Sequence, residues 1–163
     1  MLNGLLMVII FVIVTAFGIH EYDLTTAANK TSNAISEVAM VISGTERMAN
    51  GNPNYTGLDT AVAIQNGVFP SNMASPGVAA AVNGWGGAVH DDAAATGFTV
   101  TFDGVPETAC PSLASGYAGS DLLSVSINGS VLTPPVTSME ATADCTQTGS
   151  GPSGGNTVAF NVE

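Results

Sequence analysis

The first nineteen residues carry no charged side chain, and this run constrains the fold more than any other stretch of the chain. It extends from Met1 to Ile19, and the first acid is Glu21 while the first base is Lys30. A helix of this length measures roughly 28 Å at ~1.5 Å per residue, close to the ~30 Å hydrocarbon core of a bilayer. The segment is therefore long enough to cross a membrane, and it is equally suited to burial among copies of itself.

Three interpretations of this segment compete. A secretory signal peptide needs a basic n-region and a small-residue cleavage site. No Lys or Arg precedes Lys30, and no A-x-A pattern follows Ile19, which disfavours that interpretation. A plain membrane anchor is the second. The third is a longer helix that anchors in a membrane first and packs in the core of a filament later.

The spacing of apolar residues beyond the run favours the third interpretation. Small and apolar side chains continue in steps of four and three residues, the period of one helix face. They are Leu24, Ala28, Thr31, Ile35, Val38 and Ile42. We therefore predict one long helix over residues 1–50, wholly apolar in its first half and amphipathic in its second.

The charge balance excludes several classes of function. Thirteen acids against two bases give a net charge of −11, so the chain lacks the Lys and Arg that nucleic-acid phosphates require. Only 6% of residues are aromatic, whereas enzyme clefts are usually lined by aromatic side chains and a few convergent charges. We expect no direct nucleic-acid binding, no cofactor and no enzymatic activity, and a secreted or closely packed subunit instead.

The two cysteines, Cys110 and Cys145, predict a disulfide. The chain-entropy model gives a bridge over such a segment about 3.5–4 kcal/mol, as an upper figure. A disulfide implies an oxidising compartment, the periplasm or the outside of the cell, which suits an exported apolar N-terminus. Two free buried thiols in a cytosolic protein fit that terminus poorly.

The rest of the chain predicts an α+β fold in which an antiparallel sheet of four or five strands is laid on the long helix. We expect the helix to stop at 50–54, a long connection over 51–84 with a short helix at 57–64, and Ser138 as the N-cap of a late helix. The strands are predicted at 88–90, 97–103, 122–127 and 157–162, the short helices at 106–114 and 138–145, a proline-containing linker at 131–136 and a glycine-serine loop at 146–155.

Few residues form a pattern that could carry chemistry. His90-Asp91-Asp92 is a possible cation site, but we favour a solvated turn, and we predict no metal site elsewhere. No nucleophile motif or phosphate-binding loop with a following Lys occurs. The only bases, Lys30 and Arg47, lie on the amphipathic half of the long helix. They either pair with acids, in the same subunit or on a neighbour, or are solvated.

At this point the sequence resembles a known family, the type IVb pilins. The segment Asn29–Val38, NKTSNAISEV, followed by Tyr55–Asp59, is similar to the corresponding part of the bundle-forming pilins. The order of a strand at Phe98–Phe102, a Val-Pro-x-x-Ala-Cys stretch at Val105–Cys110, a second cysteine and a last strand also matches in outline. The Val-Pro-x-x-Ala-Cys stretch is most similar to the shorter, conjugative-type subunits of thin pili.

The resemblance implies the type IV pilin fold and two successive locations, the inner membrane and a filament at the cell surface. A prepilin peptidase would remove a short leader and N-methylate the new first residue, here Met1. The subunit would wait in the inner membrane, and an ATP-driven assembly machinery would build it into a helical filament at the cell surface. The implied residues of the filament core are Leu5, Leu6, Ile9, Ile10, Val12, Ile13 and Phe17.

One position departs from the family pattern. The family usually has a glutamate five residues in, which neutralises the N-terminal amine of a neighbouring subunit, and this chain has Leu5 there. We hypothesise that Asn3, or backbone carbonyls near Gly4, receive the amine by hydrogen bonding.

The predicted organisation is a hydrophobic helix over 1–25 and a head over 26–163, divided into the rest of the helix (26–50), the connection (51–84) and the sheet with the disulfide (85–163). The predicted function is the structural major subunit of a type IVb pilus that serves conjugative DNA transfer, mating contact or surface adhesion. A minor pilin or a type II secretion pseudopilin is the alternative, and a membrane-tethered binding or enzymatic domain is a third.

Overall fold

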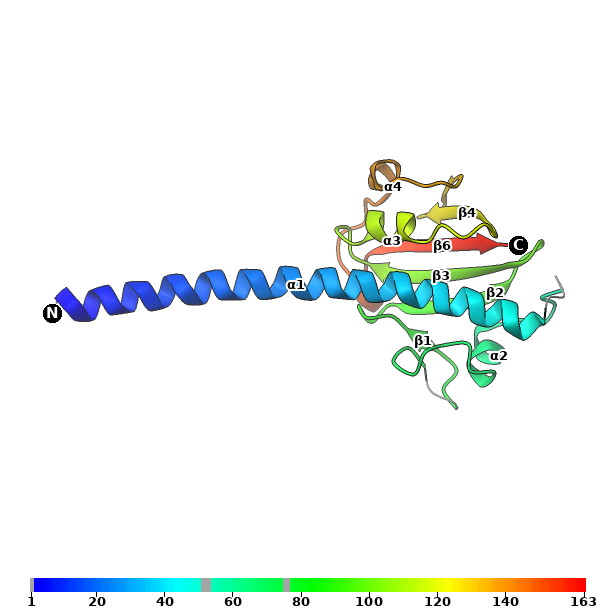
Figure 1. Cartoon of the computed structure of the whole chain (residues 1–163), viewed down its shortest axis with the longest axis horizontal. Helices are drawn as coiled ribbons and strands as arrows, with labels where there is room; N and C mark the ends of the chain where they lie inside the picture. The colour runs from blue at the N-terminus through cyan, green and yellow to red at the C-terminus, as the bar shows by residue number, and fades with distance from the viewer. Residues whose placement is uncertain (1, 51–53, 75–76) are drawn as a thin grey trace.

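In the computed structural model, the backbone is described for residues 2–50, 54–74 and 77–163, and side chains for residues 26–50, 54–74 and 77–163. Helix α1 (Leu2–Ala49) is the dominant element, and Figure 1 shows its N-terminal half extending away from the head. Asn50 follows the helix with a positive φ of 54°, a usual way for a helix to end. The predicted long helix is confirmed.

The head contains one six-stranded antiparallel sheet in the order β1-β2-β3-β6-β4-β5. Its strands are β1 (Ala81–Val82), β2 (Ala88–Ala93), β3 (Phe98–Val105), β4 (Leu122–Ile127), β5 (Ser130–Leu132) and β6 (Asn156–Val162). The last strand of the chain, β6, lies at the centre between β3 and β4, and the second half of α1 lies across the sheet (Figure 1). The predicted α+β fold, a long helix on an antiparallel sheet, is confirmed.

Alternation along the strands builds the core between the sheet and α1. In β3 and β6 every second side chain is buried, so Phe98, Phe102 and Phe160 all lie at 0% exposure. Val38 and Ile42 of α1 are also fully buried. Burying one such side chain contributes roughly 1.5–3 kcal/mol, so this layer is the main source of hydrophobic stabilisation in the head.

The short helices are α2 (Thr60–Gln65), α3 (Cys110–Gly116) and α4 (Ser138–Asp144), with a 3-10 turn, η1 (Gly151–Ser153). Helix α2 begins later than predicted because the Asp59 side chain accepts a hydrogen bond from the backbone N–H of Val62 at 2.8 Å. The prediction of Ser138 as N-cap is wrong. Thr137 caps α4, because Glu140 three residues on completes a capping box with it.

Two strands occur where none was predicted. β1 lies in the long connection, and β5 lies in the segment predicted as a proline-containing linker. β5 forms because Asn128 and Gly129 both take positive φ angles, 51° and 89°, and turn the chain back onto β4 as a hairpin. The sheet therefore has six strands rather than four or five.

The solvated turn predicted at residues 90–92 is also wrong. β2 continues to Ala93, so His90, Asp91 and Asp92 are consecutive strand residues. Strand alternation exposes His90 and Asp92 and buries Asp91 on the opposite face. The three side chains cannot converge on a cation for the same reason.

Candidate functional site: an exposed helix face and a cross-linked edge

The head-bound part of α1 has one buried face and one exposed face. The buried side chains include Ala34, Val38, Val41, Ile42 and Thr45. The opposite side presents a stripe of exposed residues at helical spacing, which we call the α1 stripe: Asn29, Ser32, Ser36, Met40, Ser43 and Arg47. Four of the six are Asn or Ser, so another helix can approach this stripe closely.

A groove of about 450 Å³ runs beside the α1 stripe. One wall is formed by Met40, Ser43 and Arg47 of α1, and the other by residues 67–70, which follow α2. Met40 is 51% exposed at this edge. The groove thus combines apolar walls with a base at one end.

Lys30 and Arg47 form no ion pair among the described residues. Within the described residues, neither comes within ion-pair distance of an acid, and the ion pair found there joins His90 Nε2 to Asp103 Oδ2 at 3.3 Å. Pairing inside the subunit, one of the predicted alternatives, is therefore not observed in the part of the chain that the structure describes. For the described residues, a neighbouring subunit and solvent are the two alternatives that remain.

The predicted N-terminal residues lie outside the described side chains. These are Met1, Asn3, Leu5, Leu6, Ile9, Ile10, Val12, Ile13 and Phe17. In the part of the chain whose side chains are described, no helix has the length and hydropathy to span a membrane.

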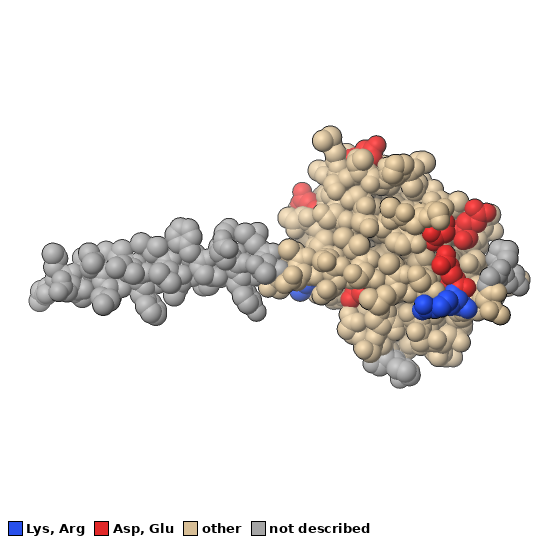
Figure 2. Space-filling view, viewed as in Figure 1, with Lys and Arg blue, Asp and Glu red and all other residues tan. Residues whose placement is uncertain are grey.

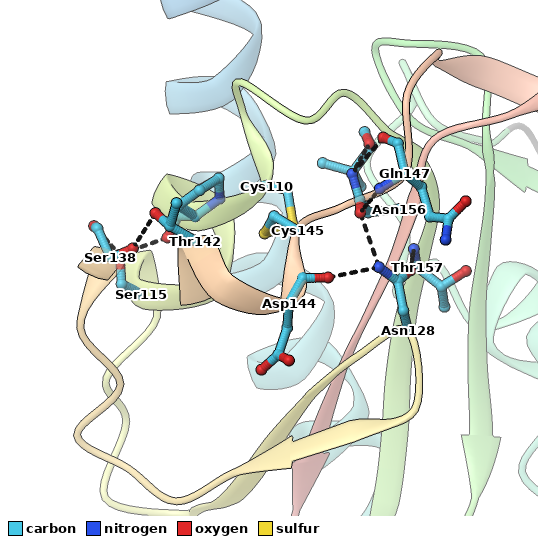
Figure 3. The surroundings of a disulfide bond; sticks show 12 residues. Cys110, Ser115, Asn128, Ser138, Thr142, Asp144, Cys145, Gln147, Asn156 and Thr157 are labelled. Atoms are coloured by element: carbon cyan, nitrogen blue, oxygen red, sulfur yellow. Dashed lines mark hydrogen bonds between the residues drawn. A yellow bond between two sulfur atoms is a disulfide. The ribbon is translucent and has the colours of Figure 1, made fainter. Parts of the chain in front are cut away.

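The second feature is the disulfide between Cys110 and Cys145, with Cα atoms 5.9 Å apart. Figure 3 shows that it joins the first residue of α3 to the C-cap residue of α4, and both cysteines are buried. The predicted disulfide is confirmed. It links two short helices that have few buried residues of their own.

A buried asparagine holds the chain on both sides of this disulfide. The Asn156 side chain, at 0% exposure, accepts hydrogen bonds from Asn128 Nδ2 at 2.8 Å and from the Gln147 backbone N–H at 3.0 Å. It donates to the carbonyls of Val105 and Gln147, each at 3.1 Å. Asn128 in turn donates to the Asp144 carbonyl at 2.8 Å (Figure 3).

Sequence reasoning missed Asn156. A signal was available, because Asn156 is in phase with Val158, Phe160 and Val162, the buried side of β6. An amide at a core position must be fully hydrogen-bonded, so such a residue marks a polar anchor.

Helix α4 has a largely exposed surface. Met139 is 87% exposed, yet its helix is fixed by the disulfide and by the Thr137–Glu140 capping box. The backbone N–H and the hydroxyl of Thr137 hold the pKa of Glu140 below its ordinary value, which keeps this carboxylate charged. Ser115 and Ser138 also bond to each other at 2.8 Å, between α3 and α4 (Figure 3).

α3 is pressed directly onto α1. A Cβ atom at Gly116 would lie 2.6 Å from Cγ1 of Ile35, a distance that side chains do not tolerate. The glycine therefore permits a close approach, and it ties the cross-linked edge to the long helix.

The structure has a helical extension on a disulfide-linked α+β head, and a match to a protein-family model agrees with this arrangement. The family model described as PilS N terminal matches residues 28–163. The chain belongs to the PilS family of type IVb pilins. This pilin is 27% identical to the type IV b pilin from Salmonella typhi, whose crystal structure aligns with a TM-score of 0.64 over 81% of this chain and 99% of that chain.

Two curated relatives are each described as the major structural subunit of bundle-forming pilus, from Escherichia coli O127:H6 (strain E2348/69 / EPEC) and Escherichia coli O111:H-. Each is 28% identical over 119 residues, which is 71% of this pilin and 62% of the relative. This pilin therefore spans less than two thirds of the length of the curated relatives. Both are structural subunits, in agreement with the prediction that the chain is not an enzyme.

Proposed function

We propose that this pilin is the major structural subunit of a type IVb pilus, a helical filament of identical subunits on the bacterial cell surface. The observation that carries the proposal is the shape of the subunit, in which the N-terminal half of α1 extends from the head (Figure 1). The two bundle-forming relatives support the same role.

Assembly would exchange lipid for contact with other copies. Residues 1–25 anchor the unassembled subunit in the inner membrane, and residues 26–163 remain outside as the head. In the filament, the core residues named above pack against those of neighbouring copies and keep their apolar surface out of water. Prepilin peptidase removes a leader and N-methylates Met1, the assembly machinery drives the exchange, and Asn3 receives the amine of a neighbour.

The filament would serve contact between cells or with surfaces. The charge of −11 argues against a shaft that holds DNA, so a role in conjugation would be mating contact rather than DNA binding. The α1 stripe leaves room for close packing of copies, while Lys30 and Arg47 remain available for acids of neighbouring subunits.

The test compares two matched variants in cells that carry the pilus genes. Ile10→Asp introduces a charge into the proposed filament core, whereas Val131→Asp makes the same kind of change at an exposed residue of β5 (67% exposed). Sheared surface material is examined by electron microscopy and mass spectrometry. We expect filaments dominated by this chain in the wild type and in Val131→Asp, and none in Ile10→Asp.

Filaments in which this chain is a trace component would favour the alternative, a minor pilin. A monomer found only in the membrane, or normal filaments from Ile10→Asp, would contradict the proposed core. Mass spectrometry of the first residue tests the methylation of Met1 in the same material.

A further inference from the structure

A group of protonatable side chains lies where the last turns of α1 meet the head. Asp91 of β2 is fully buried, and its Oδ2 accepts a hydrogen bond from Thr45 Oγ1 of α1 at 2.5 Å, while its Oδ1 is buried without a hydrogen-bond partner. Beside Thr45 on α1, Glu46 lies close to Asp121. Asp121 accepts a hydrogen bond from the Tyr117 hydroxyl at 2.9 Å.

In the part of the chain that the structure describes, no Lys or Arg lies within ion-pair distance of these acids, and the face shown in Figure 2 has acids (red) in several places and few bases (blue). The titratable groups that act on Asp91 and Glu46 are Asp92, Asp121 and Tyr55, and each of them is an acid or a phenol. Arg47 follows Glu46 on α1 but lies in the exposed α1 stripe, out of ion-pair distance of every described acid. In a chain with thirteen acids and two bases, a proton is the counter-charge that remains.

The electrostatics agree with this geometry. Burial raises the pKa of Asp91 to about 7, against the lowering effect of the Thr45 hydroxyl, and the negative charge of Asp92 raises it further. Burial and then the nearby Asp121 raise the pKa of Glu46 in the same direction.

We propose that Asp91 forms an acid-strengthened latch, in which a proton held on its buried carboxyl group fastens the last turns of α1, residues 41–49, to the head at Thr45. Because the folded state holds a proton that the opened state releases, closure is most favourable below about pH 4 and weakens as the pH rises to about 7. The latch therefore responds to acid in the direction opposite to ordinary acid denaturation.

Hydrogen exchange of the full chain in detergent micelles tests the latch. Protection factors, corrected for the intrinsic exchange rate, are measured at pH 4.5 and pH 7.5 for the amides of residues 41–49. We expect these amides to lose at least about tenfold protection at the higher pH in the wild type, since a single group of this kind can shift an equilibrium up to about tenfold per pH unit. The isosteric change Asp91→Asn should remove most of that loss.

The control is Glu107→Gln, which also removes one acid but at a different place. Glu107 precedes Thr108, which lies beside Ala27, Ala28 and Thr31 at the other end of the head-bound part of α1. General repulsion among the acids would affect all three proteins alike, so it is separated from the latch. A folded Asp91→Asn protein with the wild-type loss of protection would overturn the proposal.

A second measurement covers the case in which Asp91→Asn does not fold. The side-chain carboxyl carbon of Asp91 in the wild type is followed by NMR through a pH titration. A midpoint near 7 supports the latch, and a midpoint near 4 overturns it.

Discussion

The two edges of the head are held in place by different interactions. The cross-linked edge, residues 106–155 with α3, α4 and β5, has the disulfide, the capping box on Thr137 and the Asn156 hydrogen bonds. The connection edge, residues 54–87 with α2 and β1, has no disulfide among its described residues and ends in a strand of two residues.

A single buried asparagine anchors each edge. Asn83, 5% exposed, accepts hydrogen bonds from the backbone N–H groups of Trp85 and Gly87 and donates to the Asp103 carbonyl at 2.7 Å. On the other side, the Asn156 side chain makes four hydrogen bonds to three residues. Each edge thus depends on one buried amide, and among the described residues the disulfide is what the cross-linked edge has and the connection edge lacks.

Removing the disulfide should have the largest effect on stability, because it takes away what distinguishes the two edges. Replacing both cysteines, Cys110→Ala and Cys145→Ala, should lower the free energy of unfolding by about 2–5 kcal/mol, because the unfolded chain regains its freedom. Chemical denaturation of the two proteins, side by side under oxidising conditions, measures it. Reduction of the wild type should give a similar loss, and an unchanged midpoint in both experiments would show that the hydrogen bonds alone hold this edge.

The next effect tests the two amides against each other. Asn156→Ala leaves buried donors and acceptors without partners and should cost about 2–4 kcal/mol, while Asn83→Ala, with fewer partners, should cost about 1–3 kcal/mol. If the edges are independent, the two losses add in the double variant to within about 0.5 kcal/mol. If the loss in the double variant departs from the sum of the two single losses by more than about 1 kcal/mol, the edges are coupled through the sheet.

The sequence predicted the helices and strands in which apolar residues recur at a regular spacing. α1 followed from apolar steps of three and four, and β3, β4 and β6 followed from alternation, because each of these elements buries one continuous face. The disulfide followed from two cysteines and an exported terminus. The elements that were missed, β1 and β5, are two and three residues long, too short to carry a period, and their neighbours β2 and β4 determine them.

The candidate sites were predictable to a smaller extent. Asp91 and Asn156 are polar residues at buried strand positions. The phase of β6 indicates that Asn156 is buried, but the polar character of each side chain taken alone favours the surface. Their partners, Thr45 and Gln147, come from other elements of the chain, so only the folded structure brings them together. The Thr137 cap could have been found, because Thr-Ser-Met-Glu at 137–140 fits the capping-box pattern.

A smaller effect compares how α1 meets each edge. Gly116→Ala should destabilise the protein by about 1–3 kcal/mol, since the new methyl group must displace Ile35 and separate α3 from α1. Gly44→Ala is the matched change toward the connection edge. Its Cβ would lie 3.0 Å from Cγ1 and 3.2 Å from the carbonyl oxygen of Val68. This crowding opposes a gain in helix propensity of about 1 kcal/mol, so we expect a smaller loss than for Gly116→Ala. Thermal unfolding distinguishes them, and equal losses would remove the asymmetry.

The smallest effect concerns the capping box alone. Thr137→Ala removes the hydroxyl that accepts a hydrogen bond from the Glu140 backbone N–H and should cost about 1 kcal/mol of stability.

The same change removes the hydroxyl that helps to lower the pKa of Glu140, so the pH dependence of stability should weaken as well. A depressed pKa contributes stability above the ordinary value that is lost as the pH falls, and the wild type should lose this increment below about pH 4.5 while Thr137→Ala loses less of it. Since the disulfide holds Cys145 at the far end of α4, unfolding of this helix is local, and hydrogen exchange of residues 138–144 is the measurement that registers it. Unchanged protection of these amides in Thr137→Ala would mean that the disulfide and the Ser115–Ser138 bond fix α4 without its cap.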